Sequence, residues 1–332
     1  MSINSCDLAL TMGDPGGIGP EIIIKALPKL DNRVNPVVIG DHNTLSRVAE
    51  SVGVNIKFET MSDEELKHTA QDKISLIDCA NVSNYTPAKV TASNGSASLE
   101  YIHKAIELAK GDIVDAIVTA PIHKQAIKMA GSNHTGHTGI LADRTDSDSV
   151  SMLLLEGPLR VAHVSTHVPL AEACELVTEE RVFQTLQLTH GAINDLGFDA
   201  PRIAVAGLNP HASDGGLLGE QEQNAIEPAI ESAQNEQINA IGPISPDTVF
   251  SRAAAGEFAA VVAMYHDQGH IPIKMLGFAG ESVVSGVNVT IGLPIVRTSV
   301  DHGTAFDIVG EGQASEQSML DAIETAVRLI DT

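Results

Sequence analysis

Short runs of apolar residues alternate along this chain with longer segments in which apolar residues recur every three or four positions. Such runs are typical of buried strands and such periodic segments of amphipathic helices, so the pattern predicts an α/β protein. The predicted strands cover 8–12, 35–40, 116–120, 160–166, 202–208, 260–264 and 287–290, with two more between residues 54 and 78. The main predicted helices cover 22–27, 93–110, 178–196, 220–237 and 317–329.

Three of these predicted strands are each followed closely by a histidine. The three residues are His167, His211 and His266. In open α/β sheets, ligands bind outside the carboxyl ends of the strands. Neutral imidazole is the commonest nitrogen ligand of zinc and similar cations, and three protein ligands leave one position open for catalysis. The pattern therefore predicts a catalytic metal site, although loop histidines are common enough for three to coincide by chance.

Other polar residues beside the predicted elements suit an anion. The loop 133–139 carries His137 and Thr138 beside open backbone N–H groups, which favours a phosphate or carboxylate, or simply marks a glycine-kinked surface loop. Arg297 ends an apolar run, and its guanidinium geometry suits the same anions or a surface salt bridge. Lys274 follows the His266 strand end, and Asp247 is either a helix cap or a site carboxylate.

The first predicted strand runs into a glycine-rich turn, 13–21. This turn is not the dinucleotide-binding fingerprint, because Pro15 stands where GxGxxG requires its second glycine. A tight connection between strand and helix explains the glycines equally well.

Composition narrows the class of protein and of partner. A chain of 332 residues predicts one large or two medium domains, and its net charge of −23 argues against nucleic acid and anionic membranes as partners. Cys6, Cys79 and Cys174 form no CxxC motif or disulfide framework, which indicates a reducing, cytoplasmic compartment. The N-terminus does not read as a signal peptide, and no apolar run is long enough to span a membrane.

Several motifs carry a resemblance to known enzymes. The segments 13–21 and 302–308 resemble the β-decarboxylating dehydrogenases, the isocitrate and isopropylmalate dehydrogenase superfamily. Further motifs are Met12–Pro15, Thr119–Pro121, Gly136–Thr138, Ser165–His167, Asn209–Ala212, Tyr265–Gly269 and Arg297–Ala305. Because they span nearly the whole length, the chain is identified as a member of the 4-hydroxythreonine-4-phosphate dehydrogenase family.

This resemblance implies two α/β/α domains with a cleft between them. Residues 1–130 and 301–332 would form one domain, which contributes to dinucleotide binding. Residues 131–300 would form the central domain, with the metal ligands and the dimer interface. Family members are homodimers whose metal site is completed across the interface, so His266 is expected to serve the neighbouring subunit.

The resemblance also assigns roles to individual positions. It implies metal ligands at His167, His211 and His266, for zinc or for magnesium, cobalt or manganese. It implies substrate contacts from His137, Thr138, Lys274, Asn288 and Arg297, and catalytic roles for Lys274, Asp247 and Asp267. The dinucleotide would lie on His302, Gly303, Thr304, Ala305 and Asp307. Glu311 and Glu316 would repel a 2′-phosphate, which favours NAD over NADP.

The implied reaction is the NAD-dependent oxidation, with decarboxylation, of 4-phosphooxy-L-threonine to 3-amino-2-oxopropyl phosphate in pyridoxal 5′-phosphate (vitamin B6) biosynthesis. Gly139 stands where the family has glutamate, the loop 277–286 is longer than usual, and 269–274 resembles a paralogous branch. That branch oxidises 4-phospho-D-threonate or 4-phospho-D-erythronate, which keeps this alternative open. A distant alternative is a protein that binds phosphorylated acids without catalysis.

Overall fold

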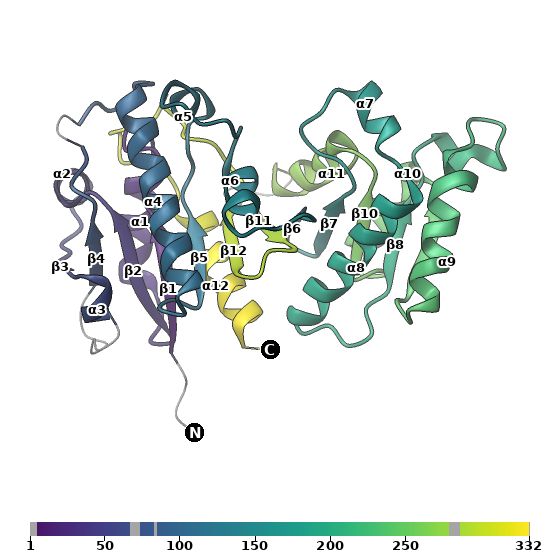
Figure 1. Cartoon of the computed structure of the whole chain (residues 1–332), viewed down its shortest axis with the longest axis horizontal. Helices are drawn as coiled ribbons and strands as arrows, with labels where there is room; N and C mark the ends of the chain where they lie inside the picture. The colour runs from purple at the N-terminus through teal and green to yellow at the C-terminus, as the bar shows by residue number, and fades with distance from the viewer. Residues whose placement is uncertain (1–4, 67–73, 83–84, 279–285, 332) are drawn as a thin grey trace. The chain divides into compact units, whose positions relative to one another are not determined.

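The computed structural model describes residues 5–66, 74–82, 85–278 and 286–331 (Figure 1). The chain forms two compact units: unit 1 comprises Met1–Asp148 and Leu293–Asp331, and unit 2 comprises Ser149–Gly292. The sequence predicted domain boundaries near residues 130 and 300. In the structure, residues 131–148 belong to unit 1 and not to the predicted central domain. The reason is that helix α6 (His137–Arg144) packs against α4 (Ala92–Lys110) of unit 1.

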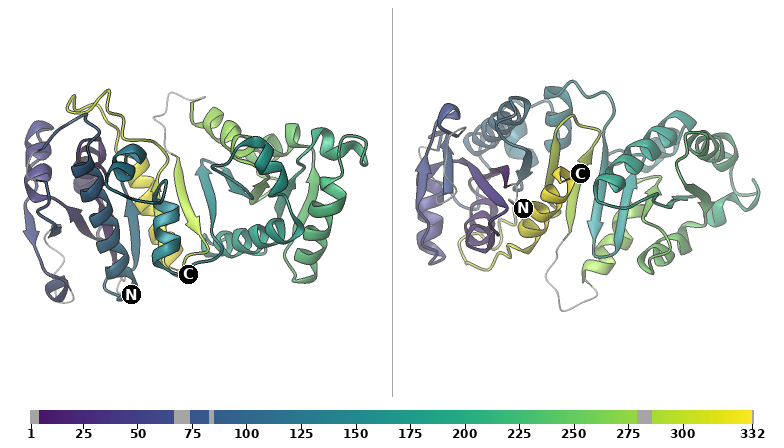
Figure 2. Two further views of the ribbon diagram at one scale, coloured as in Figure 1. Left: turned by 45° about the horizontal axis from the view of Figure 1, so that its top comes forward. Right: turned by 90° about the horizontal axis from the view of Figure 1, so that it is seen from below.

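Unit 1 is built on a parallel sheet with the strand order β3-β4-β2-β1-β5-β12. Its strands are β1 (Cys6–Thr11), β2 (Val34–Gly40), β3 (Phe58–Thr60), β4 (Ile74–Asp78), β5 (Ala116–Thr119) and β12 (Val296–Val300). Its other helices are α1 (Gly19–Ala26), η1 (Leu27–Lys29), α2 (His42–Ser51), α3 (Asp63–Leu66), α5 (Lys124–Met129) and α12 (Gln317–Ile330). Helix α4 covers one face of this sheet, and α1 and α12 cover the other (Figures 1 and 2).

Unit 2 has a mixed sheet with the order β11-β6-β7-β10-β8-β9, in which β6 pairs antiparallel with both neighbours. Its strands are β6 (Ser151–Glu156), β7 (Leu159–His163), β8 (Ile203–Ala206), β9 (Ala240–Ile244), β10 (Ala260–Ala263) and β11 (Val287–Ile291). Its helices are α7 (Leu170–Glu175), α8 (Glu179–Asp195), η2 (Pro210–Asp214), η3 (Glu222–Ile226), α9 (Glu227–Asn235), α10 (Pro246–Ala254) and α11 (His266–Phe278).

The α/β class predicted from the sequence is confirmed. Strands β8 and β10 are apolar and buried at every position because both faces of their sheet are covered. On one face of the unit 2 sheet, alternate residues such as Val161 and Val261 pack with Phe250 of α10 and Ile273 of α11. Asp41, a residue type that favours helix N-caps, caps α2 by accepting the N–H of Thr44 at 2.8 Å.

Three local predictions differ from the structure. The polar stretch after β10 is the start of helix α11, which the sequence did not predict because Gly269 and Pro272 interrupt its helical pattern. Strand β6 was not predicted as a separate antiparallel strand; a short apolar run does not reveal its partners. Residues 242–244 belong to strand β9, although the Gly-Pro pair at 242–243 is typical of a turn.

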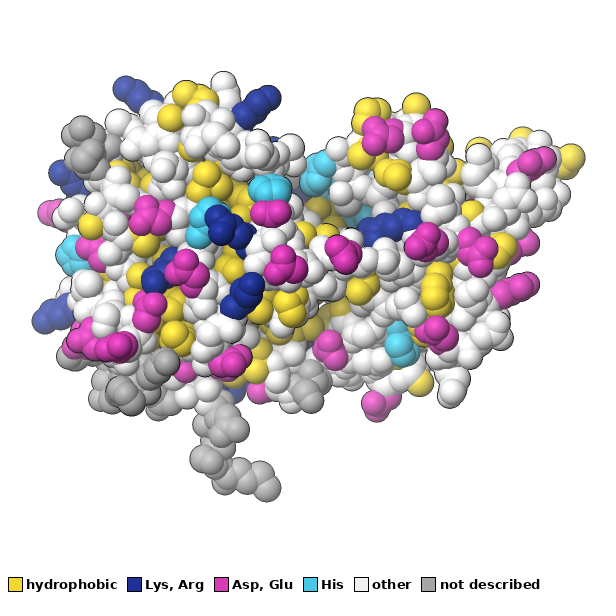
Figure 3. All heavy atoms as spheres, in the orientation of Figure 1, with side chains coloured by type: hydrophobic (Ala, Val, Ile, Leu, Met, Phe, Trp, Pro, Cys, Tyr) yellow, Lys and Arg dark blue, Asp and Glu magenta, His cyan; other side chains and the backbone are white. Residues whose placement is uncertain are grey.

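On the face shown in Figure 3, Asp and Glu side chains lie over both units, whereas most of the visible Lys and Arg side chains lie over unit 1. Within the described ranges, no helix is long and apolar enough to cross a membrane. The long loop at 277–286 falls largely on residues 279–285, which lie outside the described part of the chain.

Candidate functional site

Two of the three predicted metal ligands lie together in unit 2. Strands β7 and β10 are parallel neighbours, so His167 and His266, which follow them, meet at the carboxyl edge of the sheet. Their ring centroids are 5.6 Å apart. An open pocket of about 290 Å³ lies there, lined by Thr166, His167, Val168, Leu170, Ala173, Tyr265, His266 and Asp267. Two imidazoles on one ion, each at about 2.1 Å, have centroids roughly 5 Å apart, so this pair fits a metal.

Neighbouring groups fix the orientation of His266. Its Nδ1 lies 2.7 Å from Oδ1 of Asp267, and its ring stacks on His270 with centroids 3.6 Å apart. Nδ1 of His270 in turn lies 3.1 Å from the carbonyl oxygen of His266. A carboxylate on one ring nitrogen leaves Nε2 as the donor for a cation, which is the usual outer-shell arrangement of metal-binding histidines.

A further histidine, His163, lies next to His270. It is buried at the end of β7, and its ring centroid is 4.9 Å from that of His270. Burial lowers the pKa of His163 to about 3, so the ring is neutral. Gly269 is required here because a Cβ at that position would come 2.4 Å from Nε2 of His163. The sequence contained a signal for the stacking of His266 on His270, since these residues are four positions apart, about one turn of a helix.

His211 is not brought to the other two histidines. It begins a run of six residues with positive φ, from His211 (53°) to Gly216 (94°), which forms the turn after β8. Glu222, fully buried, accepts the backbone N–H of Asn209 at 2.7 Å and its side-chain amide at 2.8 Å. Over the described ranges, no three His, Cys, Asp or Glu side chains are grouped to hold a metal.

A buried glutamine links the two strand ends that carry His211 and His266. The side chain of Gln268 accepts the N–H of Met264 at 2.7 Å and donates to the carbonyl of Gly207 at 2.8 Å. Sequence reasoning gave Gln268 no role beyond its place in a motif.

The predicted anion-binding residues of unit 1 include a buried cation, Arg297. Arg297, only 2% exposed, donates from Nη2 to Oγ1 of Thr119 at 2.6 Å, because β12 and β5 are parallel neighbours. Burial lowers the pKa of Arg297 to about 9, so it stays protonated at neutral pH. Burial, and then the charge of Arg297, hold the pKa of His137 well below its usual range. Nε2 of His137 is shielded from solvent and has no hydrogen-bond partner among the described residues.

This arrangement suits an anion. Thr138 follows His137 in the first turn of α6, where backbone N–H groups point outward. A neutral imidazole can donate its proton to a phosphate oxygen beside the guanidinium. The alternative reading of Arg297 as a surface salt bridge is wrong, because the side chain is buried.

The remaining predicted site residues of unit 2 lie on separate elements. Lys274 is in α11 and Asn288 is in β11, where it pairs with Leu154. Asp247 lies in the first turn of α10 and accepts a hydrogen bond from Ser245 at 2.6 Å. Ser245 is the N-cap residue, so the capping interpretation of Asp247 is wrong.

The predicted cofactor residues lie in a segment of unit 1 without helix or strand, 301–316. The carbonyl of Thr304 accepts the N–H of Ile18 at 3.1 Å, which joins the two segments that resemble dinucleotide-dependent dehydrogenases. His302 turns its Nδ1 to within 3.0 Å of the carbonyl of Gly303, while Asp307 is exposed. Phe306 stacks on His123 with centroids 5.1 Å apart.

Comparison with known proteins identifies the family. Residues 32–326 match the family model described as "Pyridoxal phosphate biosynthetic protein PdxA". The chain belongs to this family.

Relatives match over almost the full length. A protein from Oceanobacillus iheyensis, provisionally named a D-threonate 4-phosphate dehydrogenase, is 46% identical over 98% of each chain. The D-threonate 4-phosphate dehydrogenase of Salmonella typhimurium is 43% identical, covering 97% of this chain and 98% of its own. The crystal structure of a 4-hydroxythreonine-4-phosphate dehydrogenase from Klebsiella pneumoniae matches with a TM-score of 0.86 and 38% identity over 99% of each chain. The family predicted from the motifs is confirmed, and the chain is a dehydrogenase.

Proposed function

We propose that this protein is a dehydrogenase that uses NAD and a divalent cation to oxidise D-threonate 4-phosphate. The observation that carries the proposal is the combination of a buried, protonated Arg297 beside neutral His137 with an imidazole pair, His167 and His266, oriented for a metal. The choice of substrate is supported by the two relatives at 43% and 46% identity, which are named D-threonate 4-phosphate dehydrogenases. It is also supported by residues 269–274, which resemble the paralogous branch that oxidises 4-phospho-D-threonate or 4-phospho-D-erythronate.

The chain's own residues would divide the work as follows. Arg297, His137 and Thr138 bind the phosphate group, and Lys274 and Asn288 contact the rest of the substrate. When bound, a divalent cation would supply Lewis-acid chemistry at the C3 hydroxyl, and NAD would supply the hydride acceptor. His167 and His266 hold the cation, and Asp267 positions His266 instead of acting on the substrate, because it accepts from Nδ1. Oxidation yields a β-keto acid, which then loses carbon dioxide.

We further propose that the enzyme works as a homodimer. Unit 2 exposes large hydrophobic side chains close to the histidine pocket: Leu170 beside His167, and Ile271, Met275 and Leu276 on α11. Exposed apolar groups of this kind mark interaction surfaces. Two ligands lie together in one chain, and a second copy would supply the third, His211. The resemblance implied a different division, with His266 as the partner's contribution; both divisions share one site between two chains.

A side-by-side assay tests the substrate. Purified enzyme with a divalent cation is offered D-threonate 4-phosphate, D-erythronate 4-phosphate and 4-hydroxy-L-threonine 4-phosphate, and NADH formation is recorded. We expect the highest kcat/KM with D-threonate 4-phosphate and loss of the rate after chelation. A higher kcat/KM with 4-hydroxy-L-threonine 4-phosphate would favour the second candidate, which the similarity to the Klebsiella pneumoniae enzyme supports. No substrate-dependent NADH formation would overturn both.

A further inference from the structure

The segment 301–316 has no helix or strand of its own, so contacts with other elements must set its conformation. It contains the residues proposed to hold the dinucleotide, His302–Asp307. Its backbone departs from ordinary conformations at Ala305 (φ 41°), Gly310 (φ 84°) and Gly312 (φ 68°). A loop of this kind keeps one conformation only if its polar groups have fixed partners elsewhere.

The turn that leads into helix α1 holds the first part of the segment. Besides the hydrogen bond from Ile18 to Thr304, Gly17 lies directly against Thr304: a Cβ at Gly17 would come 2.9 Å from the Thr304 Cβ. Glycine therefore allows the close approach of these two stretches of chain.

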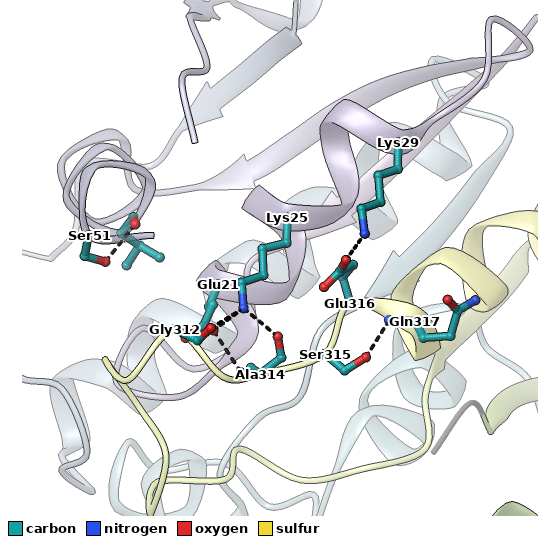
Figure 4. Close-up of polar contacts among 10 residues, drawn as sticks. Glu21, Lys25, Lys29, Ser51, Gly312, Ala314, Ser315, Glu316 and Gln317 are labelled. Atoms are coloured by element: carbon teal, nitrogen blue, oxygen red, sulfur yellow. Dashed lines mark hydrogen bonds and ion pairs between the residues drawn. The ribbon is translucent and has the colours of Figure 1, made fainter. Parts of the chain in front are cut away.

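Two side chains of α1 hold the last part (Figure 4). Nζ of Lys25 donates to the carbonyls of Gly312 and Ala314, both at 2.8 Å, and to Oε1 of Glu21 at 2.7 Å. The same Oε1 accepts the N–H of Ala314 at 2.9 Å. Three backbone groups of the segment are thus bound by one ion pair, whose side chains are 4% exposed at Glu21 and 18% exposed at Lys25. Charge-assisted hydrogen bonds shielded from water are the strong ones.

A neighbouring ion pair provides a contrast. Lys29 of η1, the short helix after α1, also pairs with Glu316 of this segment, but the Lys29 side chain is 57% exposed. Exposed ion pairs contribute little. The same contact compensates the charge of Glu316, which leaves the exposed Glu311 as the carboxylate that would disfavour a 2′-phosphate.

We propose that Glu21 and Lys25 are positioning residues for the dinucleotide: they latch the segment 301–316 onto α1 in the conformation that binds the cofactor. The inference rests on the proposed function, since it assumes that His302–Asp307 contact NAD. It gives a role to Glu21, which the sequence placed only at the end of the segment 13–21, and to Lys25, which lies in no motif.

The test measures cofactor binding separately from catalysis. Lys25→Met keeps the aliphatic stem and removes the donor, and Glu21→Gln keeps an acceptor and removes the charge. We expect the Kd for NADH, from fluorescence titration of the intact protein, to rise roughly tenfold or more in Lys25→Met and less in Glu21→Gln. Amide hydrogen exchange should speed up in 303–316, while kcat at saturating NAD stays within about twofold of wild type.

Lys104→Met is the matched control. Lys104 is also in unit 1, is 26% exposed and donates to Asp63 at 2.8 Å, away from the segment. The Kd of the Lys104→Met variant for NADH should equal that of the wild type. Thermal melts of all variants establish that each is folded, and Glu21→Gln keeps the test decisive if Lys25→Met unfolds.

Two negative results have different meanings. If wild type binds NADH and both latch variants bind it equally well, the inference is overturned while the proposed function stands, even if hydrogen exchange in 303–316 speeds up. If wild type itself binds no NADH, the cofactor assignment of the proposed function fails and takes the inference with it.

Discussion

The candidate residues of the two units are held in contrasting ways. In unit 1, Arg297 is 2% exposed and Thr304 is 9% exposed, and each is bound to a segment distant in the sequence. In unit 2, the His266 side chain is 34% exposed at an open pocket, and His211 stands apart in a left-handed turn. The proposed anion-binding group of unit 1 is thus complete within one chain, whereas unit 2 brings together two of its three proposed metal ligands, beside exposed hydrophobic side chains.

Under the proposed function, this contrast indicates where a second chain would contribute. A buried guanidinium fixed by Thr119 is already oriented for an anion and loses little freedom on binding one. Two exposed imidazoles gain a third ligand only if another surface approaches them. Association and metal binding should therefore stabilise each other in unit 2, and the substrate phosphate should depend on unit 1 alone.

Subunit complementation is the strongest test of the contrast between the two units, and it has the largest expected effect. His211→Ala and His266→Ala should each be inactive, but mixed subunits should recover about a quarter of wild-type activity, because half the dimers hold one intact site of two. Mixing His167→Ala with His266→Ala should recover nothing, because these rings lie together in one chain. Recovery in the second mixture would instead assign His266 to the partner, and no recovery in either, after proven subunit exchange, would place all three ligands in one chain.

Replacing the buried cation tests unit 1. Arg297→Met should weaken binding of the phosphorylated substrate by about 2–5 kcal/mol, or roughly 30-fold and more, since a charged group in a shielded site loses its partner. The KM for the substrate measures this loss. Metal content should stay at the wild-type level, because Arg297 belongs to the other unit. An unchanged KM would show that Arg297 serves the fold and not the substrate.

A smaller effect is expected from the link between the strand ends of unit 2. Gln268→Ala leaves the N–H of Met264 and the carbonyl of Gly207 buried without this partner, which should cost about 1–3 kcal/mol of unfolding free energy. Chemical denaturation of metal-free protein measures it. Gln187→Ala is the control, because the side chain of Gln187 is exposed and donates to Glu236 at the surface, at 2.8 Å. Equal losses of unfolding free energy in the two variants would show that Gln268 does not help to hold the histidines in place.

The smallest effect concerns a buried carboxyl of unit 1. Burial raises the pKa of Asp14, so its contribution to stability is present below the unfolded pKa of about 4 and is lost as pH rises through the folded pKa. Asp14→Asn keeps the acceptor for the N–H of Gly16, at 2.8 Å. It should raise the Tm at pH 7, with a difference that shrinks toward pH 4.

Asp31→Asn is the control, and its change in Tm should have the opposite sign, because hydrogen bonds from Arg33 lower the pKa of Asp31. Asp31→Asn should lower the Tm at pH 7, again by an amount that vanishes in acid. A Tm difference for Asp14→Asn that does not change with pH would contradict the burial argument.

The sequence by itself determined the α/β class, most strand positions and the family. These follow from local properties: the period of apolar residues, the residue that caps a helix such as Asp41, and motifs whose residues are adjacent in the chain. It also placed His167 and His266 correctly at strand ends, because the ends of buried strands are marked by an abrupt change from apolar to polar residues.

Only the tertiary structure decided which of these residues meet. His167 joins His266 because β7 and β10 are neighbours in the sheet, an order that no local pattern encodes. Arg297 became a buried cation because β12 pairs with β5, and its partner Thr119 is 178 positions away. The ion pair of Glu21 and Lys25 binds Ala314 across 293 and 289 positions. Contacts across such separations depend on how the whole chain packs, so the sequence supplied the side chains and the fold selected their partners.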